Sequence, residues 1–263
     1  MTVRELIAEI DDHMLVGANT CDTVKAGSVN KELHRVAVTM FATVETVKKV
    51  LEWGADFLIV HEPTYYEHME TLIPNDPVIA AKKKLIDESG LAIYRFHDHI
   101  HLQKPDGIDR GVADALGFDE PFEDTGFFGS YRLTAKTPVT GAELARRAEE
   151  KLGLHHVRIA GERNHPSTHI VFACGTPQGV YELLRDKETE IVITGEICEW
   201  MLAEYARDAS ALGIPKTIIV PGHIGSERDG MKALARRLSD KHKNFETRYF
   251  ECGEVYTYAD MEA

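Results

Sequence analysis

Phe57-Leu58-Ile59-Val60-His61-Glu62-Pro63 joins four consecutive apolar residues to an imidazole, a carboxylate and a proline. An apolar run of this length is typical of a parallel strand that is buried on both faces. In α/β folds, ligand sites gather just beyond the carboxyl ends of such strands. The stretch therefore predicts an α/β fold with a candidate site that begins at His61.

The alternation of apolar runs with amphipathic segments continues along the whole chain. Helices are predicted over residues 2–14, 44–53, 77–89, 108–116, 141–152, 179–185, 197–213 and 228–239. Strands are predicted over residues 36–41, 57–60, 91–96, 127–134, 157–159, 169–173, 190–194, 216–220 and 247–250. Such alternation implies parallel strands that are joined by right-handed crossovers. We predict two α/β lobes, residues 1–126 and 127–263, with mainly parallel sheets flanked by helices.

The composition narrows the class of protein. The chain has 263 residues, of which 43% are hydrophobic, and a formal net charge of −13. An acidic chain is a poor partner for nucleic acid or an anionic membrane, which favour basic patches. No window approaches the roughly 20 apolar residues of a membrane span, and the first residues form no apolar signal core. We expect a cytoplasmic protein with a small-molecule substrate.

Cysteine and histidine are used very differently. The four cysteines are far apart and form no Cys-x-x-Cys pair, so neither a disulfide framework nor a thiolate zinc site is indicated. The chain has 13 histidines, several of them in tight groups. Imidazole and carboxylate groups together suit borderline or hard divalent cations.

The most unusual group is His97-Asp98-His99-Ile100-His101, which follows the predicted strand over 91–96. If that strand continues, residues two apart face the same side, and the three imidazoles converge. Three histidines on one face make a poor core, because every ring nitrogen needs a partner. The alternative is a polar loop with solvated histidines.

Two further patches carry the same residue types. His61 and Glu62 can bind one ion only if the chain turns there, which Pro63 favours by fixing its own φ; the alternative is an exposed strand end. His223 and Glu227 approach one centre if a helix has begun by Gly225, since residues four apart share a helix face. The alternative is that Ser226 or Glu227 caps the helix predicted over 228–239.

The order of these patches resembles the Nif-three-like dinuclear-metal family, whose members are often labelled GTP cyclohydrolase I type 2 homologues. The resemblance rests on the His-x-Pro after Leu58-Ile59-Val60, the histidine tract at 97–101, Thr194-Gly195-Glu196, and Gly222-His223 with Glu227. It covers about Val36 to Gly253. It implies a two-lobed α/β subunit, a pair of metal ions in a cleft and a toroidal homohexamer.

Carried over by position, the resemblance implies a set of five metal ligands: His61, Glu62, His101, His223 and Glu227. Glu62 stands where the family usually has a second histidine, and His101 stands where it usually has a bridging aspartate. One imidazole and one carboxylate have exchanged places, so the set remains three nitrogens and two carboxylates. Trp200 stands where histidine is common, which leaves no acid or base at that position. The implied cofactor is two divalent ions per chain, zinc, manganese or iron.

A pair of divalent ions can activate water and stabilise a phosphoryl or acyl transition state. We therefore predict a metal-dependent hydrolase of a small phosphorylated, nucleotide-like or cyclic amide substrate. Asp98, His97 and His99 are the candidate catalytic residues, as general base or as groups that orient the ligands. The alternatives are a non-catalytic metal-binding or regulatory assembly, and a structural metal that joins the lobes.

Overall fold

The computed structural model describes residues 1–11, 19–70, 75–127, 129–177 and 179–258. The chain forms two compact units, each made of two segments. Unit 1 comprises Met1–Gly107 and Met231–Gly253, and unit 2 comprises Ile108–Gly230 and Glu254–Ala263. These units divide the chain differently from the predicted boundary at residue 126. The reason is that β11 (Glu246–Tyr249) pairs with β2 (Arg35–Thr39), which returns the segment after residue 230 to the first sheet.

Unit 1 contains a five-stranded sheet in the order β1-β4-β3-β2-β11. Its other strands are β1 (Val24–Ala26), β3 (Phe57–Val60) and β4 (Ala92–Arg95). β4, β3, β2 and β11 are parallel, and β1 adds an antiparallel edge that the sequence reading did not predict. All four residues of β3 are buried, as expected for a strand covered on both faces.

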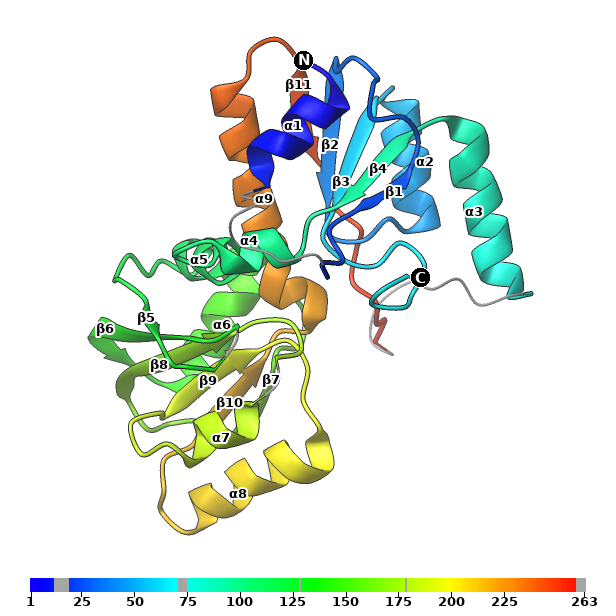
Figure 1. Cartoon of the computed structure of the whole chain (residues 1–263). Helices are drawn as coiled ribbons and strands as arrows, with labels where there is room; N and C mark the ends of the chain where they lie inside the picture. The colour runs from blue at the N-terminus through cyan, green and yellow to red at the C-terminus, as the bar shows by residue number, and fades with distance from the viewer. Residues whose placement is uncertain (12–18, 71–74, 128, 178, 259–263) are drawn as a thin grey trace. The chain divides into compact units, whose positions relative to one another are not determined.

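Helices cover both faces of this sheet (Figure 1). α2 (Val44–Glu52) and α3 (Pro77–Ser89) share one apolar core with the strands, which includes Leu58 and Ile93. α1 (Val3–Ile10) lies toward the other face, because Asp11 at its end accepts a hydrogen bond from Tyr94, the neighbour of Ile93. The part of the predicted helix at residues 12–14 lies outside the described residues.

Unit 2 contains a six-stranded mixed sheet in the order β5-β6-β8-β9-β10-β7. Its strands are β5 (Glu123–Asp124), β6 (Tyr131–Val139), β7 (Arg158–Gly161), β8 (Ser167–Ala173), β9 (Ile191–Thr194) and β10 (Thr217–Val220). β8, β9 and β10 are parallel neighbours, whereas β5, β6 and β7 pair antiparallel. The three parallel strands end at the same edge, so the loops that follow them gather there.

The helices of unit 2 follow the predicted order with one difference. α6 (Gly141–Leu152) has the predicted bounds, and α5 (Gly107–Ala115) and α7 (Val180–Arg185) lie within a residue of theirs. The helix predicted over 197–213 is a π-helical turn, η1 (Glu199–Ala203), followed by α8 (Glu204–Ala211). α9 runs from His223 to Lys241, with residues 223–230 in unit 2 and 231–241 in unit 1.

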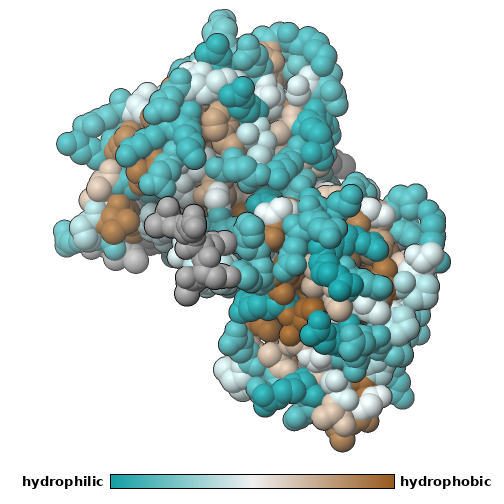
Figure 2. All heavy atoms as spheres, turned by 180° about the vertical axis from the view of Figure 1, so that it is seen from behind, coloured by the Kyte–Doolittle hydropathy of each residue, from teal (hydrophilic) through white to brown (hydrophobic). Residues whose placement is uncertain are grey.

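No helix within the described residues is long and apolar enough to cross a membrane. The face of the molecule turned to the viewer in Figure 2 is mainly hydrophilic, with smaller hydrophobic areas between the polar ones. This surface agrees with a chain in which 28% of the residues are charged.

Candidate metal centre

The histidine tract neither continues strand β4 nor forms the polar loop that was the alternative. It forms a short helix, α4 (Asp98–Leu102), with His97 at its amino end. Residues four apart share a helix face, so His97 and His101 converge, whereas His99 points elsewhere. The helix begins here because Asp22, from a distant segment, accepts hydrogen bonds from the backbone N–H groups of residues 97, 98 and 99.

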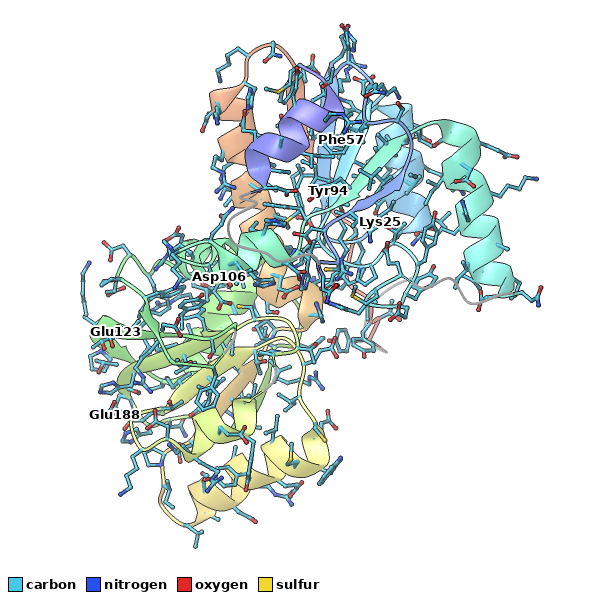
Figure 3. The ribbon with its side chains drawn as sticks, in the orientation of Figure 1. Lys25, Phe57, Tyr94, Asp106, Glu123 and Glu188 are labelled. Carbon is cyan, nitrogen blue, oxygen red and sulfur yellow. The ribbon has the colours of Figure 1, made fainter. Side chains whose placement is uncertain are left out.

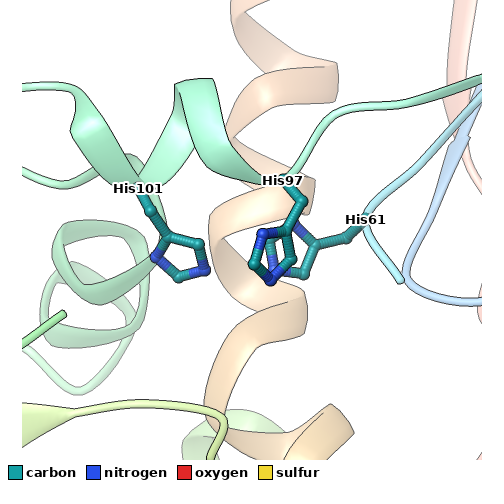
Figure 4. Close-up of side chains that lie close together, drawn as sticks. All are labelled: His61, His97 and His101. Atoms are coloured by element: carbon teal, nitrogen blue, oxygen red, sulfur yellow. The ribbon is translucent and has the colours of Figure 1, made fainter. Parts of the chain in front are cut away.

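His61, His97 and His101 form a compact group within unit 1 (Figure 4). The ring centroids are 4.7 Å apart for His61 and His97, 5.1 Å for His61 and His101, and 4.9 Å for His97 and His101. One potential ligand atom from each residue lies within 4.8 Å of the others. The structure therefore places His97, one of the three candidate catalytic residues, beside the predicted ligands His61 and His101.

Each ring of this histidine trio is oriented by an acceptor at Nδ1. The Nδ1 of His61 lies 3.1 Å from the carbonyl oxygen of Phe96, and the Nδ1 of His97 lies 2.9 Å from Oδ1 of Asp98. The Nδ1 of His101 lies 2.9 Å from Oδ2 of Asp106. A carbonyl or carboxylate oxygen only accepts, so in the neutral form of each ring Nδ1 carries the proton and Nε2 carries the lone pair. Metal-binding histidines are held in this way.

Burial keeps His61 neutral. The side chain is fully buried, which lowers the pKa of its imidazole well below the usual range, and the neighbouring rings of His97 and His101 lower it further. A neutral imidazole is the form that binds a metal ion. His61 is therefore in the form that can bind a divalent cation.

Asp98 is an ionised acceptor. Burial raises the pKa of its carboxyl, but hydrogen bonds from His97, Thr20 and Cys21 outweigh burial and hold the pKa well below its usual range. A carboxylate that stays ionised at neutral pH orients the ring of His97 and holds its Nδ1 proton. Burial also raises the pKa of the Cys21 thiol, which therefore stays protonated and is a poor ligand.

His99, the third candidate catalytic residue, lies outside the trio. Its Nδ1 is 2.7 Å from Oδ2 of Asp22 and 3.8 Å from Oδ1 of Asp11. Asp11, Asp22 and His99 are close enough to hold an ion. However, Asp22 already accepts hydrogen bonds from the backbone at the start of α4. This structural role explains the position of the group without a metal ion.

Glu62 lies beside a buried arginine that the sequence reading missed. Arg95 at the end of β4 is fully buried, and its guanidinium lies 3.5 Å from Oε2 of Glu62. The same side chain donates to the carbonyl oxygens of His61 and His68. Arg95 therefore fixes the backbone after β3 and balances the charge of Glu62.

The loop after Glu62 is pinned by two lysines. The amine of Lys82 donates to the carbonyl oxygen of Thr64 at 2.6 Å and lies 4.7 Å from the ring centroid of Tyr66. Lys25, labelled in Figure 3, pairs with Glu70 at 2.8 Å, and Glu70 accepts from the backbone N–H of Thr64. Burial lowers the pKa of Lys82 to about 8. These contacts fix the loop that follows His61 and Glu62, the first two predicted ligands.

Unit 2 holds the other two predicted ligands. α9 begins at His223, so Ser226 and Glu227 lie inside the helix, and the alternative that they cap it is wrong. The Nε2 of His223 is 3.2 Å from Oε2 of Glu227, which is buried. Adjacent ligands on one ion, each at about 2.0–2.2 Å from it, are separated by a similar distance.

Glycines let the strand-end loops of unit 2 approach this pair. Gly175, after β8, has φ +66, and a Cβ there would overlap Oε1 of Glu227. A Cβ at Gly195, after β9, would lie 2.6 Å from Oγ of Ser226. Larger residues at either position would displace the carboxylate or the start of α9.

Comparisons with known proteins agree with this fold. The chain is 22% identical over 222 residues to the GTP cyclohydrolase 1 type 2 homolog of Clostridium perfringens, covering 82% of this chain and 81% of the relative. It is 25% identical over 217 residues to the protein of the same name from Vibrio cholerae, covering 80% and 82%.

Solved structures show the same architecture. Protein ybgI, described as of unknown function, superposes with a TM-score of 0.79 at 17% identity, covering 97% of this chain and 100% of that one. Reduced HcgD from Methanocaldococcus jannaschii gives a TM-score of 0.72 at 15% identity, covering 95% and 97%. The sequence profile of one protein family matches residues 1–254, nearly the whole chain. The chain therefore belongs to that family, Duf34/NIF3 (NGG1p interacting factor 3).

Proposed function

We propose that this protein binds divalent metal ions and uses them to hydrolyse a small phosphorylated, nucleotide-like or cyclic amide substrate. The observation that carries the proposal is the histidine trio of unit 1, in which three imidazoles meet and each Nδ1 is held by an acceptor. The name that the relatives carry, GTP cyclohydrolase 1 type 2 homolog, supports a nucleotide-like substrate.

The residues present fit a divalent ion. His61, His97 and His101 supply three imidazole nitrogen donors, the set found in some zinc enzymes, and imidazole also suits iron. His223 and Glu227 supply a nitrogen and an oxygen in unit 2. That His61, Glu62, His101, His223 and Glu227 together hold two ions, zinc, manganese or iron, stays a prediction from the family resemblance.

A bound divalent ion would supply Lewis-acid chemistry, polarising a substrate oxygen and lowering the pKa of water. The chain's own residues prepare the site for it. Asp98 and Asp106 keep protons on the outer nitrogens of His97 and His101, and Arg95 compensates the charge of Glu62. Asp98 stays ionised, so its part is to orient His97 instead of donating a proton.

The test has two stages. Purified protein is loaded with zinc, manganese or iron in turn, and bound metal per chain is measured by ICP-MS. The loaded protein is then offered a panel of phosphoesters, nucleotides and cyclic amides. Metal binding with turnover of one class supports the proposal. Metal binding without turnover of any would favour the alternative, a non-catalytic metal-binding or regulatory assembly.

We also propose a homohexamer, because the family resemblance implies a toroidal assembly. The mass of the native particle, measured by light scattering after size-exclusion chromatography, tests this independently of metal. A monomeric or dimeric mass would contradict it.

A further inference from the structure

His223 lies between two carboxylates of unit 2. The residue follows β10 and opens α9, while Glu196 follows β9, the neighbouring parallel strand (Figure 1). The Nδ1 of His223 is 2.7 Å from Oε1 of Glu196, and its Nε2 is 3.2 Å from Oε2 of Glu227. One imidazole thus has a carboxylate oxygen near each of its nitrogens.

A neutral imidazole has one N–H group, whereas both carboxylates can only accept. The contact with Glu196 is the shorter one and has the length of a charge-assisted hydrogen bond, which assigns the proton to Nδ1. The lone pair of Nε2 then faces an oxygen of Glu227. Two such electron-rich atoms at 3.2 Å are stabilised when they share a cation.

We infer that Glu196 is a positioning residue, which holds the proton on Nδ1 of His223 and so presents Nε2 to a divalent cation shared with Glu227. This inference rests on the proposed function, because it concerns one of the predicted ligands. It assigns a role to the acid of Thr194-Gly195-Glu196, a motif to which the sequence analysis gave no part in the site.

The backbone around Glu196 supports this role. The N–H of Glu196 donates to the carbonyl oxygen of Gly175 at 2.9 Å, and the N–H of Gly175 donates to Oγ of Ser226 at 3.0 Å. The loops after β8 and β9 are therefore bonded to each other and to the first turn of α9. Glu196 starts from a fixed backbone position even though its side chain is 55% exposed.

Thr176 is a second group near Nδ1. Its hydroxyl oxygen lies 3.2 Å from that nitrogen. A hydroxyl can donate as well as accept, so it does not by itself fix the proton on Nδ1. The carboxylate of Glu196 is closer and accepts only, and it therefore decides the tautomer.

The first readout needs no metal. In apoprotein with ¹⁵N-labelled histidine, at about pH 8.5 where imidazole is ordinarily neutral, solid-state NMR distinguishes a protonated ring nitrogen from a bare one. The histidine signals that are missing from the spectrum of His223→Gln are those of His223. We expect Nδ1–H in the wild type and in Glu196→Gln, which keeps an acceptor oxygen, and mainly Nε2–H in Glu196→Ala.

The second readout is zinc affinity, followed through the Nε2 signal of His223. Loss of a group that orients a ligand typically lowers metal affinity by about 10–100-fold, and we expect this for Glu196→Ala with partial recovery in Glu196→Gln. Glu199→Ala is the matched control, because Glu199 is an exposed carboxylate of the same segment that pairs with Arg158 instead. It should behave as the wild type.

Each failure has its own signature. A bare Nδ1 in the wild-type apoprotein, or an unchanged tautomer and zinc affinity in Glu196→Ala, would overturn this inference alone. A wild-type His223 that zinc never perturbs would overturn its place in the proposed metal function. An equal loss of affinity in Glu199→Ala would show that only the charge of the segment matters, which also overturns the inference.

Discussion

Nδ1 of His101 lies 2.9 Å from Oδ2 of Asp106, a carboxylate with no exposed surface. The two residues belong to one short stretch, since Asp106 follows α4 by four residues and is labelled in Figure 3. The carboxylate therefore orients the imidazole and holds its proton on Nδ1.

Asp106→Asn tests that relationship. The amide oxygen is a weaker acceptor than the carboxylate and holds the proton on Nδ1 less firmly, so a larger share of the rings carries it on Nε2, the nitrogen that faces the other histidines. We expect zinc affinity to fall by about 10–100-fold, measured by competition with a chromogenic chelator. Asp114→Asn, an exposed aspartate in an i,i+4 pair with Arg110, serves as the control. Equal affinities in both variants would contradict the prediction.

His61→Gln should remove most metal binding in unit 1. The ring is fully buried at the centre of the trio, and a glutamine offers no imidazole nitrogen. We expect the bound metal per chain, measured by ICP-MS, to decrease while the circular dichroism spectrum is kept. His34→Gln is matched in chemistry but has a side chain that is 73% exposed. If both variants retain the wild-type metal content, His61 is not a ligand.

Arg95→Met should destabilise unit 1. The substitution leaves Glu62 buried without its cation and two carbonyl oxygens without their donor. Removing one partner of a buried ion pair costs about 3–5 kcal/mol. Urea denaturation followed by circular dichroism measures this loss. Glu62→Gln combined with Arg95→Met should recover part of it, whereas a strictly additive double variant would mean that the two side chains do not interact.

Lys82 makes stability depend on pH in an alkaline window. Burial lowers its folded-state pKa from 10.5 to about 8, so between these pH values the unfolded chain binds more protons than the folded one. Stability relative to Lys82→Met should therefore rise with pH from about 8 toward 10.5, by on the order of 2 kcal/mol. Urea titrations of both proteins across this range measure the difference. A difference that stays flat would contradict the prediction, and Lys83→Met, which lies on the exposed side of α3, should show none.

Most of the fold follows from local patterns. The apolar run Phe57–Val60 and the helix Pro77–Ser89, with Asp76 as its cap and Gly90 at its end, have their predicted bounds because each is determined by neighbouring residues. The strand β1 was missed because its three residues are partly exposed and pair only at an edge. The sequence predicts an ordinary helix at the π-helical turn η1, since a single turn of five residues is too short to change the apolar pattern of the whole segment.

The site was only partly predictable, because its geometry depends on contacts between residues that are far apart in the sequence. The spacing of His97 and His101 suits a helix face, but the helix α4 depends on Asp22, which is 75 residues away in sequence from His97. No pattern in the neighbouring residues indicates that Asp22 accepts hydrogen bonds from the start of this helix. Arg95 was likewise read as part of a strand, and its pairing with Glu62 spans 33 residues. Long-range polar contacts of this kind decide which histidines converge, and a sequence pattern does not contain them.

The pairing of β11 with β2 has a consequence for the synthesis of the protein. β2 is complete when residue 39 has been made, but its partner strand consists of residues 246–249. Until those residues leave the ribosome, the nascent first sheet has an open edge beside β2, and open edges favour association between chains. The three histidines of the trio are all present by residue 101, so a metal ion could reach them before the sheet is closed. Pulse-labelling of ribosome-bound chains with and without zinc would show whether early binding protects that edge.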